Sequence, residues 1–539
     1  MDGAAIAPHL LALGRQAPHS ESLRGHFTAL LGVEDELVAF TDWMGVASLY
    51  EVRAAGRVYL SNRVDLLARL LCRFHRDEAR FDHASWAQGL ISEGRFGRTH
   101  TSTHLYLEGL SWYRPDEMAS IRGAQVERVR RYRLEDIQPD REAYAAYLRQ
   151  AAVEIRENLE AALSAPQFAH RVLMLSGGFD SRLILAGLVS LGRQDEIHAA
   201  SWAGHDAADP VLASALVKAF NLKPTRIDAA RPQSHERSLE IWTSLNMGLG
   251  NQFRPLHGPV ATAETTWMAR LVGGGGESLR AHISKVAAAA LGPDEPCPPT
   301  RPLLTRMIQA LGEECVASRE GVALAIDRHA QSIDALPGAD PLTRLDFTQF
   351  YHKARVFFGD LALCAFAHHP YLIMPLFAPG AVKAGLAAAP AHRFAGGLVF
   401  DLFMQLCPPL AYMPFAHGAW SAGAVDGAPS ARFLQSDAIR LPADAGIMAG
   451  APLLRPAPGP PPPDTGVAVA DVNAWMAGRI RPALDAALED PDWGPLVAAD
   501  RARRRLDFVA RKRPAYLAVW TSRLAALGHY RRLLSEGGT

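Results

Sequence analysis

The sequence has no excess of charge of one sign and no long apolar run. Its 539 residues include 56 lysines and arginines and 56 aspartates and glutamates, so bulk charge gives no attraction for nucleic acid. No uninterrupted apolar stretch approaches the roughly 18 residues that suit a membrane-spanning helix, and the opening MDGAAIAPHL lacks the basic and apolar regions of a secretory signal. We therefore expect a cytoplasmic protein with no nucleic-acid partner and no membrane span.

Cysteine is scarce, and its spacing excludes the common cysteine-based metal sites. The sequence contains no CxxC pair, which favours reduced thiols in the core. The hydrophobic fraction of 49% and the charged fraction of 21% are ordinary for a globular protein. At about 100–200 residues per domain, the length predicts two or three domains. The five cysteines are Cys72, Cys297, Cys315, Cys364 and Cys407.

The most informative stretch is Arg171–Leu188, RVLMLSGGFDSRLILAGL. It begins with an apolar run without polar alternation, which is typical of a strand buried on both faces. Ser176, Gly177 and Gly178 then allow a tight turn whose amide N–H groups can converge on an anion at the N-terminus of the next helix. Asp180 would repel an unshielded phosphate, but its carboxylate suits Mg²⁺ held against phosphates, and Ser181 adds a hydroxyl donor.

This loop is not a Walker A motif, because no GxxxxGK[ST] occurs, and it is not GxGxxG. SGGFDS after a strand resembles the PP-loop of enzymes that split ATP into AMP and pyrophosphate while they adenylate a substrate. The resemblance implies that Leu175, and Ser201 in the next strand, also contact the nucleotide. The alternative is an ordinary glycine-rich turn between a strand and a helix.

Further strands and helices alternate around this loop. The pattern predicts strands at Ile197–Trp202 and Thr225–Ala229, with helices at Glu142–Leu163 and Asp209–Phe220. Such alternation is typical of a doubly wound parallel sheet, which binds ligands outside the carboxyl ends of its strands. The fold class predicted for this part is therefore α/β.

A second glycine run follows in Arg270–Arg280, RLVGGGGESLR, with the order strand, glycines, acid, helix. It resembles the second nucleotide motif of the asparagine synthetase family, G-x-G-x-D-E. The resemblance implies nucleotide contacts from Gly273 and Gly275, and it places Glu277 where the family has an aspartate that shares Mg²⁺ with the PP-loop aspartate. The alternative is a flexible turn whose glutamate satisfies a helix N-terminus.

The N-terminal part is rich in short apolar segments separated by glycines. They predict a β-meander, with strands at Phe27–Leu31, Leu37–Phe40, Ser48–Val52 and Val58–Ser61. GHFTALL, DWMGVASLYEV and GRVYLSNRVDLL, followed by YLEGLSWYRPD and ERVRRY, resemble the second half of the glutaminase domain of class B asparagine synthetases.

That domain is of the N-terminal-nucleophile type, and its nucleophile is an N-terminal cysteine. Asp2 stands at the corresponding position here, and the segment that would hold glutamine is missing. We therefore expect residues 1–135 to form a truncated, inactive glutaminase-like domain. Residues 140–539 would form the synthetase domain, with a proline-rich surface loop at 451–464 and C-terminal helices at Asp471–Leu488 and Arg501–Leu534.

The family's catalytic side chains have no identical counterparts. LIMPLFAPGAVKAGLAAAPAHR resembles the stretch that follows the family's catalytic glutamate, but His368 and Tyr371 occupy that neighbourhood instead of an acid. In PFAHGAWSAG, His417 stands where the family has a lysine that cradles phosphates. Arg432 or Arg440 is the alternative source of that positive charge.

The resemblance implies an enzyme that uses Mg²⁺ and ATP to adenylate a carboxylate, after which an amine displaces AMP. Without an internal ammonia source, the simplest reaction is attack by an amine of the same substrate, and lasso peptide cyclase is the most specific hypothesis. The substrate would be a peptide or small-molecule carboxylate, with a leader-peptide-binding or protease protein as partner. The alternatives are an amidotransferase-like synthetase that uses free ammonia or an external amine, and a non-catalytic ATP-binding scaffold.

Overall fold

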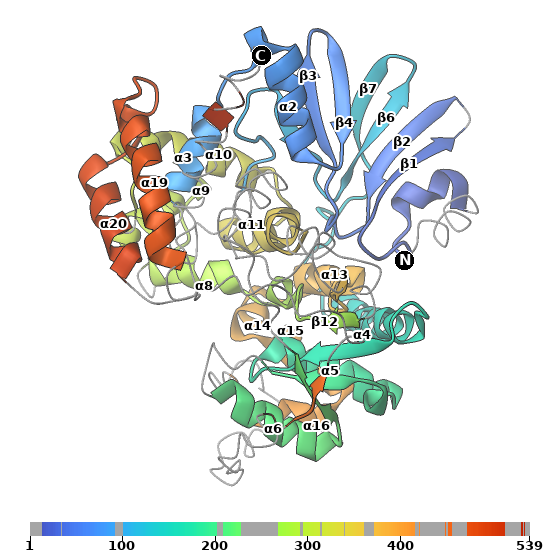
Figure 1. The fold of residues 1–539 in the computed structure, drawn as a ribbon. Helices are drawn as coiled ribbons and strands as arrows, with labels where there is room; N and C mark the ends of the chain where they lie inside the picture. The colour runs from blue at the N-terminus through green and yellow to red at the C-terminus, as the bar shows by residue number, and fades with distance from the viewer. Residues whose placement is uncertain are drawn as a thin grey trace, which may run out of the picture.

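The protein is a mixed α/β structure with one five-stranded parallel sheet and separate antiparallel sheets (Figure 1). The computed structural model describes residues 13–33, 35–91, 101–201, 208–227, 268–291, 295–312, 315–338, 340–359, 371–415, 420, 448, 451–454, 472–511, 530, 531 and 533, and the structural statements concern these residues. The α/β class predicted from the sequence is thus confirmed.

Two antiparallel sheets form the N-terminal part. One has the order β1-β2-β6-β7, with β1 Thr28–Val33, β2 Glu36–Thr41, β6 Glu117–Arg122 and β7 Gln125–Arg130; the other has the order β4-β3-β5, with β4 Arg57–Ser61, β3 Tyr50–Ala54 and β5 Leu110–Trp112.

The four predicted N-terminal strands exist, but the predicted meander is wrong. The strands β1 and β2 pair with each other, as do β3 and β4, yet β2 pairs next with β6 rather than with β3. A small buried cluster joins Ala39 of β2 and Ala119 of β6 to Leu49 and Tyr113, which lie next to β3 and β5 of the other sheet.

The parallel sheet has the order β10-β9-β8-β12-β13. The predicted first and second strands are confirmed as β8 and β9. The third strand of the sheet, β10, lies just before the predicted Thr225–Ala229, and the described part of that prediction contains β11, which pairs with β14 instead. The strands are β8 His170–Met174, β9 His198–Ala200, β10 Lys223–Pro224, β11 Arg226–Ile227, β12 Met268–Leu271, β13 Tyr371–Ile373 and β14 Leu453–Leu454. The pair β11–β14 also shows that the predicted loop 451–464 begins with a short strand.

The sheet reverses its direction of growth at β8. The next strand along the chain, β9, lies on one side of β8, and β12 lies on the other. The helices α4 Arg141–Ser164, α5 Phe179–Leu191 and α6 Ala208–Phe220 agree with the sequence pattern. This reversal leaves room for a ligand between the loops that follow β8 and β12.

Helix α4 is held closely against α5 and against α13 Pro379–Ala387. A Cβ atom on Gly187 of α5 would lie 2.5 Å from Leu159 Cδ1, and one on Gly380 of α13 would lie 2.6 Å from the Ala151 nitrogen. The buried Glu154 side chain accepts a hydrogen bond of 2.7 Å from the Gly380 N–H. It thereby satisfies a backbone donor in the first turn of α13 that has no partner within the helix.

The remaining helices surround the region between the sheets, where α11 lies centrally in Figure 1. They are α2 Val64–Phe74, α3 His83–Leu90, α8 His282–Ala289, α9 Thr300–Leu311, α10 Arg319–Asp334, α11 Pro341–Thr348, the π-helix η7 Gln349–Gly359, α14 Pro390–Ala395, α15 Gly397–Leu406, α16 Pro408–Ala411, α19 Val472–Glu489 and α20 Ala499–Arg511. The predicted helix at Asp471–Leu488 is confirmed as α19, and the basic segment that follows begins with α20.

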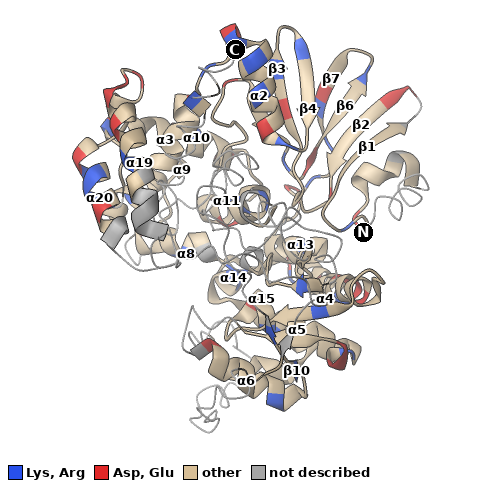
Figure 2. Ribbon diagram, in the orientation of Figure 1, with Lys and Arg blue, Asp and Glu red and all other residues tan. Residues whose placement is uncertain are grey.

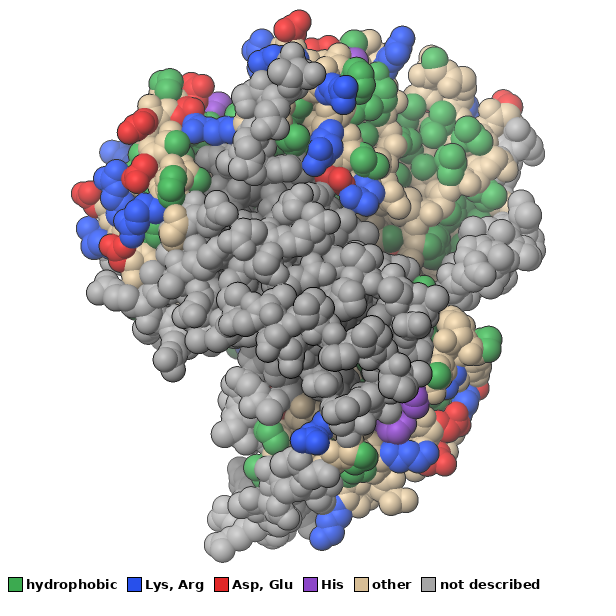
Figure 3. Space-filling model, viewed as in Figure 1, with side chains coloured by type: hydrophobic (Ala, Val, Ile, Leu, Met, Phe, Trp, Pro, Cys, Tyr) green, Lys and Arg blue, Asp and Glu red, His purple; other side chains and the backbone are tan. Residues whose placement is uncertain are grey.

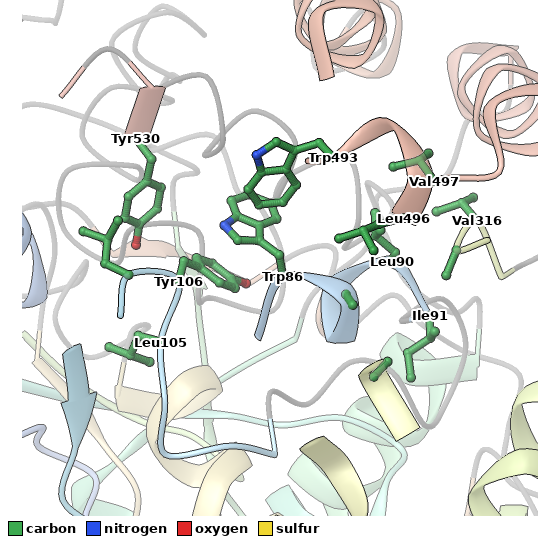
Figure 4. Packing of buried hydrophobic residues seen from close by; sticks show 14 of the residues in the cluster. Trp86, Leu90, Ile91, Leu105, Tyr106, Val316, Trp493, Leu496, Val497 and Tyr530 are labelled. Carbon is green, nitrogen blue, oxygen red and sulfur yellow. The ribbon is translucent and has the colours of Figure 1, made fainter. Parts of the chain in front are cut away.

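The largest hydrophobic core joins the N-terminal strands and helices to the C-terminal helices. Trp86 of α3 stacks on Tyr106, with ring centroids 4.5 Å apart, and meets Trp493 edge-on at 4.9 Å (Figure 4). Tyr530 completes the group at 5.8 Å from Tyr106. Residues from 50–112 and from 283–530 therefore bury their apolar surface together.

The surface carries charges of both signs. Figure 2 shows basic and acidic residues interspersed on α19 and α20, and Figure 3 shows the same mixture of charged side chains on that side of the molecule. In the part of the chain that the structure describes, no helix has both the length and the apolar character needed to cross a membrane. The thiols of Cys72, Cys297, Cys315 and Cys407 are free, as predicted.

Candidate functional site

The two glycine loops identified in the sequence lie side by side at the carboxyl edge of the parallel sheet. One follows β8 and the other follows β12, and these strands are hydrogen-bonded neighbours. The Leu175 N–H donates to the Ala200 carbonyl at 2.7 Å, and the Val272 N–H donates to the Ile373 carbonyl at 2.9 Å. Pairing thus extends to the base of each loop and fixes where both loops begin.

The first loop is held by its own serines. The Ser176 N–H donates to Ser181 Oγ at 3.0 Å, the two hydroxyl oxygens are 3.0 Å apart, and the Gly178 N–H donates to Ser176 Oγ at 3.2 Å. Helix α5 then begins without a side-chain cap, with Gly178 at the N-cap position. Its first backbone N–H groups remain directed toward the loop, which suits an anion.

A carboxylate from outside the loop also reaches it. Asp209, in the first turn of α6, accepts a hydrogen bond of 2.7 Å from the Gly177 N–H. Sequence reasoning gave Asp209 no role in the site. The sequence did contain a signal for such a role, because Asp209 lies at the start of the helix that follows the second strand. That helix begins at the carboxyl edge of the sheet, where the loop also lies.

Asp180 lies between the two loops. A Cβ atom on Gly276 would lie 2.2 Å from Asp180 Oδ1, and one on Gly273 would lie 2.6 Å from Asp180 Cβ. A side chain at either position would therefore force Asp180 to move. Arg280 donates to Asp180 Oδ2 at 2.8 Å and to the Gly276 carbonyl at 3.4 Å, so it joins the aspartate to the second loop.

The second loop rests on the segment after β13. Gly275 has a φ of +96°, which favours glycine, and a Cβ atom there would lie 3.2 Å from Leu376 and Phe377. A Cβ atom on Gly274 would lie 2.7 Å from Met374 Sδ and 2.9 Å from Phe358 of η7. The glycine run thus allows the segments that follow β8, β12 and β13 to approach one another closely.

The predicted nucleotide contacts from Ser201 and Leu175 also lie at this edge. Ser201 follows the last residue of β9, and its buried hydroxyl oxygen has no hydrogen-bond partner among the described residues. Leu175 is buried beneath the loop. Ser201 therefore offers a free donor and acceptor beside the first loop.

Of the predicted catalytic residues, Tyr371 is the one that the structure describes. Tyr371 is the first residue of β13, with its ring 5.3 Å from Phe168, which precedes β8. In a parallel sheet this is the amino end, and Tyr371 lies about 7 Å before the carboxyl end of its strand. His368, His417, Arg432 and Arg440 lie outside the described residues.

A segment before His417 does pack on the site. Arg182, adjacent to Ser181, is buried and donates to the Met413 and Pro414 carbonyls at 2.7 and 2.6 Å. Its guanidinium lies 3.8 Å from the Phe415 ring centroid. Burial lowers the pKa of Arg182 to about 9, so it stays protonated at neutral pH.

Aromatic stacking completes the attachment of this segment. The Phe179 ring centroid is 4.3 Å from that of Phe415 and 4.8 Å from that of Trp420. The backbone at 413–415 is therefore fixed against the start of α5. Sequence reasoning assigned the stretch PFAHGAWSAG to the site but missed Arg182.

Oxygen donors suitable for Mg²⁺ are present at this edge. Asp180 and Asp209 both contact the loops, and carboxylates are preferred Mg²⁺ ligands. Glu277 lies in the short helix η5 Gly276–Leu279, but its side chain is not described. No group of three or more His, Cys, Asp or Glu side chains that could hold a metal occurs among the side chains that are described.

Comparison of the chain with models of known protein families gave no match, and comparison with curated proteins gave none either.

Proposed function

We propose that the protein is an AMP-forming carbon–nitrogen ligase that binds Mg·ATP between the loops after β8 and β12. The observation that carries the proposal is the position of Asp180, which lies between two glycine loops at the point where the sheet reverses. Crevices at such reversals are the usual ligand sites of open α/β sheets. SGGFDS and GGGGES add the resemblance to the asparagine synthetase superfamily.

In the proposed site, the first turn of α5 and the Ser176 and Ser181 hydroxyls bind phosphate oxygens. Asp180 and Asp209 supply carboxylates for Mg²⁺, which when bound neutralises the phosphates. Arg280 is a permanent cation at the same place. The substrate carboxylate attacks the α-phosphorus and releases pyrophosphate, and an amine then attacks the acyl carbon and releases AMP.

The proposed division of the chain follows the same resemblance. Residues 1–135 would be the inactive glutaminase-like part, and residues 140–539 the synthetase part. In the proposed reaction the amine would come from the substrate itself, which closes a lactam or macrolactam ring as in lasso peptide cyclases.

A second candidate is a non-catalytic nucleotide-binding protein. The observation that favours it is that the chain's own charges already engage the site: Asp180 pairs with Arg280, and the Gly177 N–H pairs with Asp209. A nucleotide must compete with both contacts. The two candidates agree on Mg·ATP binding and differ on turnover.

The first test is calorimetric titration of the full-length protein with ATP and Mg²⁺. We expect Asp180→Ala to weaken binding about tenfold or more, because a hydrogen-bonded charged partner contributes about 1.5–3 kcal/mol. Asp195→Ala, which removes an exposed aspartate near the C-terminus of α5, is the matched control and should bind as the wild type does. Equal affinity in all three proteins would exclude the nucleotide site.

The second test is exchange of labelled pyrophosphate into ATP with a panel of peptide and small-molecule carboxylates. A ligase should show exchange that depends on one class of carboxylate and is lost in Asp180→Ala. Mg·ATP binding without exchange for any carboxylate would favour the non-catalytic candidate.

A further inference from the structure

Five arginines are buried in the described part of the chain, and one of them differs from the rest. Four donate hydrogen bonds to protein oxygens: Arg114 to Asp116, Arg131 to the Thr41 carbonyl, Arg182 to the Met413 and Pro414 carbonyls, and Arg393 to the Gly385 carbonyl and Thr343. Arg355 is 2% exposed, and its Nε, Nη1 and Nη2 atoms have no hydrogen-bond partner among the described residues.

Arg355 lies on η7, at the boundary between the antiparallel sheets and the parallel-sheet region. The Trp112 ring of β5 lies beside the guanidinium, with its centroid 5.1 Å from Arg355 Cζ. At the end of η7, a Cβ atom on Gly359 would lie 2.3 Å from the Val46 carbonyl oxygen, so this element is pressed against the N-terminal part. Long π-helical segments are rare and often mark functional sites.

The charges that act on Arg355 come from groups that already have partners. Asp42 accepts from the Val46 and Ala47 N–H groups at 3.1 and 2.8 Å. Glu117 accepts from the Arg114 N–H at 2.8 Å, and Arg128 donates to Ser111 at 2.9 Å. Tyr50 also acts on Arg355; the two carboxylates attract the guanidinium, Arg128 repels it, and none of these groups accepts a hydrogen bond from it.

A buried charge without hydrogen bonds is costly, and natural interiors rarely retain one. Burial lowers the pKa of Arg355 to about 10, so the side chain remains a cation at neutral pH. Its planar fork of N–H donors matches the two oxygens of a carboxylate. The neighbouring core is aromatic and aliphatic, with Phe350, Ala354 and Phe358 from η7 itself, which suits the apolar remainder of a carboxylic acid.

We propose that Arg355 anchors a buried binding site for a carboxylate, which accepts a paired hydrogen bond from the guanidinium beside the Trp112 ring. This site binds the carboxylate without adenylating it. The inference therefore goes beyond the proposed ligase function and requires no nucleotide. The site is nevertheless close to the nucleotide loops, because Phe358 on η7 contacts Gly274.

The test uses the full-length protein without nucleotide. Thermal unfolding is followed with formate, acetate or benzoate, and with chloride and phosphate as controls at constant ionic strength. Ligand that binds only the folded state raises the melting temperature with its concentration. We expect at least one carboxylate to do this and chloride and phosphate not to do so.

Two variants assign the effect to the guanidinium. Arg355→Met removes an unpaired buried charge at similar volume, so its melting temperature without carboxylate should equal or exceed that of the wild type, and the carboxylate response should disappear. Arg355→Lys keeps the charge but not the fork, and its apparent carboxylate affinity should be about tenfold weaker. Arg393→Met, which breaks existing hydrogen bonds, should instead lower the melting temperature and leave the carboxylate response intact.

Three results would overturn the proposal. The first is a wild type that none of the three carboxylates stabilises. The second is a response that persists in Arg355→Met or that phosphate reproduces. The third is a loss of stability in Arg355→Met as large as that in Arg393→Met, which would make the guanidinium a structural contact.

Discussion

Substituting Gly276 by alanine perturbs Asp180 with one added carbon atom. The new Cβ would lie 2.2 Å from Asp180 Oδ1, whereas ordinary contacts begin near 3.4 Å, so the carboxylate must move by about 1.2 Å. Arg280 holds the same carboxylate at 2.8 Å and also bonds to the Gly276 carbonyl. Movement of Asp180 therefore disrupts the contact that joins the two loops.

The effect on a reaction at this site should be large compared with the effect on folding. A displacement of about 1 Å in positioned groups can reduce rate about 100-fold. Added volume in a packed site costs about 1–3 kcal/mol of stability, which a protein of this size can tolerate. We therefore expect Gly276→Ala to fold, to bind Mg·ATP about tenfold more weakly, and to lose about 100-fold in pyrophosphate exchange.

Gly478→Ala is the matched control, because no atom lies within 4 Å of its added Cβ and the position is exposed on α19. Circular dichroism and urea unfolding report folding, and calorimetry with Mg·ATP reports the site. A Gly276→Ala protein that binds Mg·ATP with wild-type affinity would refute the assignment of Asp180 to the nucleotide site.

Two further predictions concern buried carboxylates. Burial raises the pKa of Asp42 from 3.8 to about 6, so the folded state binds the proton more tightly than the unfolded state and loses stability as the pH rises from 4 to 7. The free energy of unfolding of Asp42→Asn relative to wild type should therefore rise by about 2 kcal/mol over that interval; a difference independent of pH would contradict it. Glu154→Ala leaves the Gly380 N–H without its 2.7 Å partner and should cost about 1–3 kcal/mol in urea unfolding. The exposed Glu157→Ala is its control, and an equal small effect in both would contradict the role of Glu154.

The elements around the proposed nucleotide site could be predicted because their signals are local. The apolar run before Ser176 and the two following glycines specify a buried strand and a tight turn within a few residues. The expectation that the loops after β8 and β12 share a ligand site then follows from the general preference for ligand sites at the carboxyl ends of parallel strands. No comparable local signal distinguishes pairing of β2 with β6 from pairing with β3, since either partner could cover the apolar residues of β2.

The contacts that complete the site could not be predicted from the sequence. Asp209 lies 32 residues from Gly177, and Arg280 lies 100 residues from Asp180. Such pairs depend on how loops from different strands approach, which hydrophobic periodicity does not specify. The same reason separates Tyr371 from the loops: its sequence neighbourhood suggested catalysis, but it begins a strand whose opposite end faces the site.

These two contacts also indicate how the proposed site would accept its nucleotide. Asp209 is an anion that accepts a hydrogen bond from the Gly177 N–H, and in the proposed site this N–H would donate to phosphate. Arg280 is a cation paired with Asp180, and in the proposed site this carboxylate would bind Mg²⁺. If the site binds Mg·ATP, phosphate would compete with Asp209 for the Gly177 N–H, and Mg²⁺ would compete with Arg280 for Asp180. Asp209 would then be able to hold Mg²⁺, and Arg280 would be able to hold phosphate. Each charged side chain displaced in this way would thus find a new partner on the ligand.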